Sequence, residues 1–101
     1  MDERLFMDTP GTDCTLRWED ALLPASLSEA DLDRIIFAEM TFQLRKTALV
    51  IVKTVTRCEA LGLPVDADLI GARLAALAEA DRIDSAGNIR KWRYSEVRLK
   101  D

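Results

Sequence analysis

Residues 66–99, DADLIGARLAALAEADRIDSAGNIRKWRYSEVRL, form the stretch of the sequence that decides the fold. Asp66 or Asp68 can cap the start of a helix, because a carboxylate there accepts hydrogen bonds from amides that have no partner within the helix. The apolar residues that follow recur every three or four positions, the spacing of one helical face: Ile70, Leu74, Leu77 and Ala78. We therefore predict a helix that ends near Asp81.

A β-hairpin is predicted directly after this helix. Ile83 and Asp84 form its first strand, residues 85–88 its turn and residues 89–99 its second strand. Gly87 and Asn88 supply the positive φ angles that a tight hairpin turn needs. The apolar alternation slips twice within the second strand, which predicts β-bulges there.

Two further helices are predicted before residue 66. The first begins at residue 28 or 29, where serine hydroxyls followed by acids are typical of a helix start. Its apolar face carries Leu32, Ile35, Ile36 and Met40. The second helix runs from about residue 41 to residue 61, since no proline or glycine interrupts this stretch. Residues 47–52 are rich in β-branched side chains and are also compatible with a buried strand, but the wider apolar spacing favours the helix.

The first 25 residues contain several turn signals, and we predict an N-terminal arm over residues 1–25 followed by one domain over residues 26–101. A short strand is predicted in the arm from Cys14 to Trp18. The fold class is α+β and mostly helical. Helix, helix, turn, helix and hairpin is the order of a winged-helix domain, in which glycine usually stands near the position of Asp81. Aspartate is among the better substitutes for glycine at a left-handed helix end.

Three segments together resemble an uncharacterised bacterial domain family with a winged-helix-like C-terminal helical module. They are residues 27–33, Arg73-Leu74, and residues 92–99, within a match of about residues 25–99. In that family the module often follows a separate N-terminal domain. The resemblance implies the fold and a bacterial cytoplasmic setting, but it implies no activity.

Composition argues against an enzyme. The chain contains no histidine, so the commonest general base and the commonest zinc ligand are both missing, and we expect neither a catalytic site nor a cofactor nor a bound metal. Cys58 lies in the apolar stripe of the second helix, where a buried structural role is expected, and Cys14 is the better candidate for an exposed thiol. No apolar run reaches the roughly 18 residues of a membrane span, so we expect a cytoplasmic protein without a membrane partner.

Acidic and basic blocks alternate along the chain. Residues 1–33 carry nine acids and two bases, residues 34–63 two and five, residues 64–84 five and two, and residues 85–101 two and five. We therefore expect a protein-interaction or assembly module that contacts a second copy or another protein through its second helix and its hairpin. The candidate contact residues, for a protein or for nucleic acid, are Arg90, Lys91, Trp92, Arg93, Tyr94 and Arg98.

Two alternatives stay open. A weak or non-specific DNA-binding regulator is the second interpretation, although the third helix has more acids than bases and no amide side chain to recognise adenine. The apolar centre of the second helix favours a homodimer through that helix. The other arrangement is cover within one chain by Trp18, Leu22 and Leu23.

Overall fold

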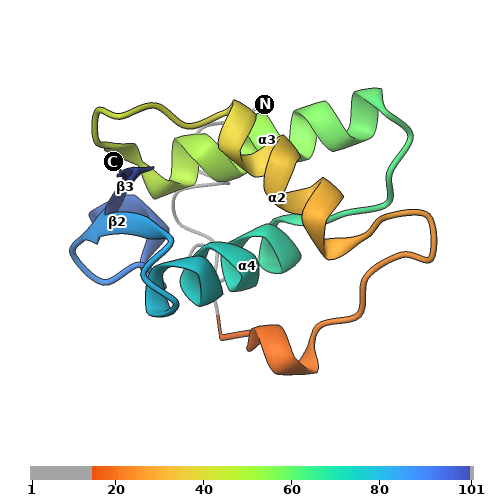
Figure 1. The fold of residues 1–101 in the computed structure, drawn as a ribbon, viewed down its shortest axis with the longest axis horizontal. Coiled ribbons are helices and arrows are strands. Elements are labelled where there is room, and N and C mark those ends of the chain that lie inside the picture. The colour runs from red at the N-terminus through yellow and green to blue at the C-terminus, as the bar shows by residue number, and fades with distance from the viewer. Residues whose placement is uncertain (1–14, 101) are drawn as a thin grey trace.

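The computed structural model describes residues 15–100 of the chain, and Figure 1 shows how their elements are arranged. The three-stranded sheet and the C-terminus lie at one end, the helices extend away from the sheet, and the N-terminal segment passes below α4. This arrangement confirms the α+β class with three α-helices and a C-terminal β-hairpin. In chain order the elements are η2 (Trp18–Asp20), α2 (Glu29–Ala38), β1 (Arg45–Lys46), α3 (Thr47–Ala60), α4 (Ala67–Glu79), β2 (Ile83–Ala86), η3 (Trp92–Tyr94) and β3 (Glu96–Leu99), where η denotes a 3-10 helix.

The start of α2 agrees with the sequence prediction. The Ser28 hydroxyl accepts a hydrogen bond from the backbone N–H of Asp31 at 3.1 Å, so this serine is the N-cap residue. Leu32 and Ile36 are fully buried on the inner face of the helix. The helix ends at Ala38, and Met40, expected on the same face, is buried just beyond the helix end.

The second predicted helix begins later than expected, at Thr47 instead of about residue 41. The Thr41 hydroxyl accepts hydrogen bonds from the Gln43 backbone N–H (3.2 Å) and from Arg45 Nε (3.3 Å), which fixes a turn at residues 41–45. Arg45 then pairs with Val97 of β3, so residues 45–46 form a strand. The start of α3 thus depends on pairing with a strand more than 50 positions away, and the spacing of apolar residues within the helix does not reveal this pairing. Residues 47–52 are helical throughout, which excludes the strand interpretation.

The start and the end of α4 agree with the prediction. Asp66 Oδ1 accepts a hydrogen bond from the Leu69 backbone N–H at 2.9 Å, and the last helical residue is Glu79. Asp81 has a φ of 61°, the left-handed conformation expected at a position that glycine usually fills. The chain then enters β2, which pairs antiparallel with β3.

The second strand of the hairpin is shorter than predicted and corrects the expectation of bulges. Only Glu96–Leu99 pair as β3, while residues 89–95 form a turn and the 3-10 helix η3. Trp92 turns inward against Gly71 of α4, where an added Cβ would lie 2.6 Å from Trp92 Cζ2. The interrupted alternation of apolar residues in the predicted second strand therefore results from this inward turn, and not from β-bulges. Gly87 has the expected positive φ of 80°, but Asn88 is not among the positive-φ residues of the described chain.

The predicted strand at Cys14–Trp18 is wrong where it can be compared. Cys14 lies outside the described residues, residues 15–17 are not in a strand, and Trp18 begins η2. The side chains of Leu16 and Trp18 pack on the core, and η2 packs against α4 instead of joining the sheet. Leu22 is 90% exposed and does not contribute to the cover within one chain, whereas Trp18 and Leu23 pack against the core cluster that contains Val50 and Ile51 of α3.

Candidate interaction surfaces

The predicted contact residues of the hairpin fall into three groups. Arg90 Nη1 donates a hydrogen bond to the Leu16 carbonyl oxygen at 2.8 Å, and Arg98 Nε lies 3.2 Å from Asp84 Oδ2 across the hairpin. Trp92 is 1% exposed and belongs to the core, which corrects its place among the contact residues. Of the remaining three, Lys91 and Tyr94 are exposed and Arg93 is half-buried, and Arg98 is also exposed beside its ion pair.

These accessible residues lie against the first turn of α3. A hydrogen bond of 2.8 Å joins the hydroxyls of Ser95 and Thr47, and the Thr47 backbone N–H donates to the Ser95 carbonyl oxygen at 3.0 Å. Lys46 Nζ donates to the Arg93 carbonyl oxygen at 3.3 Å. The hairpin and the start of α3 therefore lie side by side, with Lys46, Lys91 and Arg93 near each other and Glu96 opposite Lys46 in the sheet.

The outer face of α4 is covered. Every residue from Leu69 to Leu77 is buried or half-buried. Part of the cover comes from residues 15–20. The Arg73 guanidinium lies 4.7 Å from the centre of the Trp18 ring, and Arg90 donates a hydrogen bond to the Leu16 carbonyl oxygen. A helix that reads DNA must enter the major groove, so α4 is not presented for that purpose in this arrangement.

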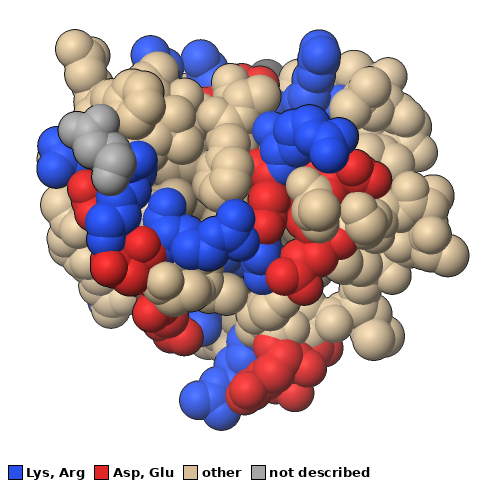
Figure 2. Space-filling view, in the orientation of Figure 1, with Lys and Arg blue, Asp and Glu red and all other residues tan. Residues whose placement is uncertain are grey.

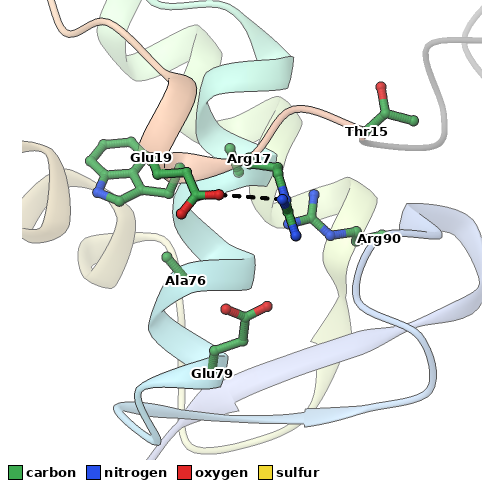
Figure 3. Close-up of a pocket in the computed structure, with 8 residues that line it drawn as sticks. Thr15, Arg17, Glu19, Ala76, Glu79 and Arg90 are labelled. Atoms are coloured by element: carbon green, nitrogen blue, oxygen red, sulfur yellow. Dashed lines mark ion pairs between the residues drawn. The ribbon is translucent and has the colours of Figure 1, made fainter.

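A cleft of about 450 Å³ remains between residues 15–19, α4 and Arg90 (Figure 3). In Figure 3 the guanidinium groups of Arg17 and Arg90 lie close together above the Glu79 carboxylate, and a dashed line joins Arg17 to Glu19 at 3.4 Å. The α4 side chains in the cleft are Ala72, Ala76 and Glu79. None of these three α4 side chains can donate a hydrogen bond to a base edge, so α4 itself presents no base-reading donor in the cleft.

Arg73 and Asp33 form a buried ion pair that the sequence interpretation missed. Arg73 Nε and Nη2 donate to the two Asp33 carboxylate oxygens at 2.6 and 2.7 Å, and both residues are at most 6% exposed. Glu29 lies 2.9 Å from Arg73, and Arg82 lies 3.3 Å from Asp33. The hydrogen bond with Asp33 is the main reason that the pKa of Arg73 is raised above its usual value. Helix capping and dipole compensation therefore do not account for Asp33. In the sequence, the ion pair could have been suspected because Asp33 and Arg73 carry opposite charges and both stand next to apolar positions of their helices.

Exposed apolar side chains concentrate in one short segment. Four of the seven large hydrophobic side chains exposed among residues 15–100 belong to residues 42–52: Phe42, Leu44, Leu49 and Val52. Residues 40–58 contain no acid and four bases, namely Arg45, Lys46, Lys53 and Arg57. A shallow groove of about 360 Å³ runs along this face of α3, lined by Glu39, Val52, Lys53, Thr56, Arg57 and Ala60. We call these groove residues, together with Leu49, the α3 face.

The remaining reactive groups offer little chemistry. Cys58 is fully buried in α3, and burial raises the pKa of its thiol above the ordinary value of 9.0. Within residues 15–100 no group of three or more acids or cysteines is placed to hold a metal ion. None of the helices in the same range is long and apolar enough to cross a membrane.

Charges of both signs intermix over the visible face in Figure 2, around α2, α4 and the N-terminal segment. No family model, no curated protein and no solved structure matches this chain. The resemblance to a bacterial domain family therefore stays a prediction from the sequence.

Proposed function

We propose that this protein is a non-enzymatic interaction module that assembles with a protein partner through the α3 face and the neighbouring hairpin. The observation that supports this proposal is the concentration of exposed apolar side chains within residues 42–52, next to four bases and no acid. Leu49 and Val52 lie one turn apart on α3, whereas Phe42 lies beside Arg98 and Leu99 of β3. Exposed apolar side chains that are rimmed by polar groups are typical of protein-interaction sites. The bacterial cytoplasmic setting belongs to the same proposal and is supported by the resemblance alone.

The partner is a second copy of the chain or another protein. The sequence argument for a homodimer was the apolar centre of α3, and the single chain already covers that centre, since Val50, Ile51 and Cys58 are fully buried. A stable interface usually buries about 800 Å² on each partner. Leu49 and Val52 are each 42% exposed and supply only a small part of such an area, so a homodimer needs the hairpin and residues 42–44 as well.

DNA binding is the second candidate, with the domain acting as a variant of the winged helix. It is favoured by Lys91, Arg93 and Lys46, which lie together with the exposed aromatic ring of Tyr94 and suit contact with a phosphate backbone. The covered face of α4 and the intermixed charges of Figure 2 favour the protein-interaction role, because sequence reading needs an accessible helix and strong non-specific binding needs one dominant sign of charge.

The test is a fluorescence-anisotropy titration of mixed-sequence duplex DNA at low and at physiological salt, with light scattering on the same sample. We expect no DNA binding at physiological salt. A dimer mass would identify the partner as a second copy, and a monomer mass would leave another protein as the partner. Tight binding with a steep salt dependence, abolished by K91A and R93A, would overturn the proposal and make the protein a DNA binder led by its hairpin.

A further inference from the structure

The α3 face combines apolar contact area with two cations in a fixed geometry. Lys53 and Arg57 stand one helical turn apart on the exposed side of α3, and Val52, Thr56 and Ala60 lie in the same groove. Residues four positions apart on a helix surface have Cβ atoms about 5–6 Å from each other. Glu39 is the one carboxylate among the residues that line the groove, and Glu59, which is also exposed on α3, does not line it.

A matching partner must therefore bring apolar side chains for the groove and carboxylates for its cationic side. We propose that the α3 face binds an acidic amphipathic helix of another protein, with acids one turn apart opposite Lys53 and Arg57. Such a helix repeats the spacing of the two cations and lays an apolar stripe along Val52 and Ala60, the usual arrangement of a helix bound in a groove. This inference rests on the proposed function and names the chemistry of the partner.

A second copy of the chain fits this face poorly. In a symmetric dimer the same patch meets itself, so the patch must supply both signs of charge. The groove is lined by two bases, Lys53 and Arg57, and by one acid, Glu39, so two copies paired through this face would leave more cations than carboxylates in the interface. An anionic membrane surface also fits poorly, because the whole chain has a net charge of −4.

The experiment uses the full chain and three labelled helical peptides about four turns long, identical except for the residues that flank a leucine stripe, which are Glu, Gln or Lys. Anisotropy at physiological salt gives the affinities, and amide chemical shifts of the protein locate the site. We expect the Glu peptide to bind at least about tenfold more tightly than the Gln peptide, and the Lys peptide not to bind. The shifts should map to residues 49–60.

A charge swap provides the control. The double variant K53E/R57E should lose about tenfold in affinity for the Glu peptide and should gain binding of the Lys peptide. The single reversal R17E should change neither affinity, because Arg17 lies in the cleft beside α4, away from the α3 face, and its ion pair with Glu19 is about 70% exposed. Circular dichroism confirms that each variant is folded.

Other outcomes overturn the inference in distinguishable ways. Equal binding of all three peptides at residues 49–60 would refute the acidic partner but leave the α3 face as a protein-interaction surface. Binding of the Glu peptide elsewhere, or no binding of any peptide, would refute the α3 site, while the light-scattering and DNA measurements still decide the proposed function. Binding to phosphatidylserine vesicles without peptide binding would replace the protein partner with a membrane surface.

Discussion

At the scale of single residues, Arg73 has the most consequential environment in the described chain. Its guanidinium joins Asp33 of α2, Glu29 at the start of the same helix and the Trp18 ring, so it fastens two separate elements to α4. Burying these charges is costly, and the bidentate pair offsets that cost only while both partners are present. The network therefore specifies how α2 and residues 18–20 sit on α4, more than it adds to stability.

Replacing Asp33 with asparagine should destabilise the protein strongly. The variant leaves the buried Arg73 charge with the half-exposed Glu29 as its remaining carboxylate, and we expect the free energy of unfolding to fall by about 3 kcal/mol in urea denaturation. The double variant D33L/R73M removes both charges and should recover most of that loss, since neither charge is then buried alone. A D33N variant as stable as the original chain would mean that Glu29 compensates the buried Arg73 charge without Asp33.

At the scale of elements, the end of α4 depends on a residue in the left-handed conformation. Asp81 has a φ of 61°, which costs most non-glycine residues about 1–2 kcal/mol. Aspartate tolerates this conformation better than alanine does, so D81A should lower the free energy of unfolding by about 1 kcal/mol. D81G should be at least as stable as the original chain, although it also removes an exposed ion pair with Lys100. Thermal unfolding of both variants checks the order, and an unchanged melting temperature for D81A would contradict it.

The sequence predicts those features of the elements that depend on near neighbours. The caps at Ser28 and Asp66 and the turn at Asp81 each involve groups within a few positions, so the local pattern contains them. The strand β1 depends on pairing with β3, and the inward turn of Trp92 depends on the missing Cβ of Gly71, so neither is visible locally. The candidate contact residues show the same division, since the bases of the hairpin can be counted in the sequence but the burial of Trp92 cannot.

At the scale of the whole molecule, the arrangement decides which helix faces outward. Residues 15–20 cover α4, and the hairpin closes on α3, so α3 carries the accessible apolar and cationic face while α4 serves as the central core helix. This arrangement leaves two explanations for the N-terminal cover. Residues 15–20 complete the core, or they mask α4, which would bind DNA once these residues move away.

The variant W18A separates these two explanations. Loss of the Trp18 ring from Arg73 should loosen residues 15–20, detected as faster amide hydrogen exchange, and should cost about 2 kcal/mol of stability because the ring is only half-buried. L22A is the matched control, since Leu22 lies in the same segment and is 90% exposed. We expect no sequence motif to be enriched when W18A selects from a random duplex library, because Arg73, the α4 donor under the Trp18 ring, is held by Asp33, and Ala72, Ala76 and Glu79 have no donor that reads guanine or adenine. Enrichment of a motif by W18A but not by L22A would show that α4 is a masked reading helix and would reverse the order of the two proposed functions.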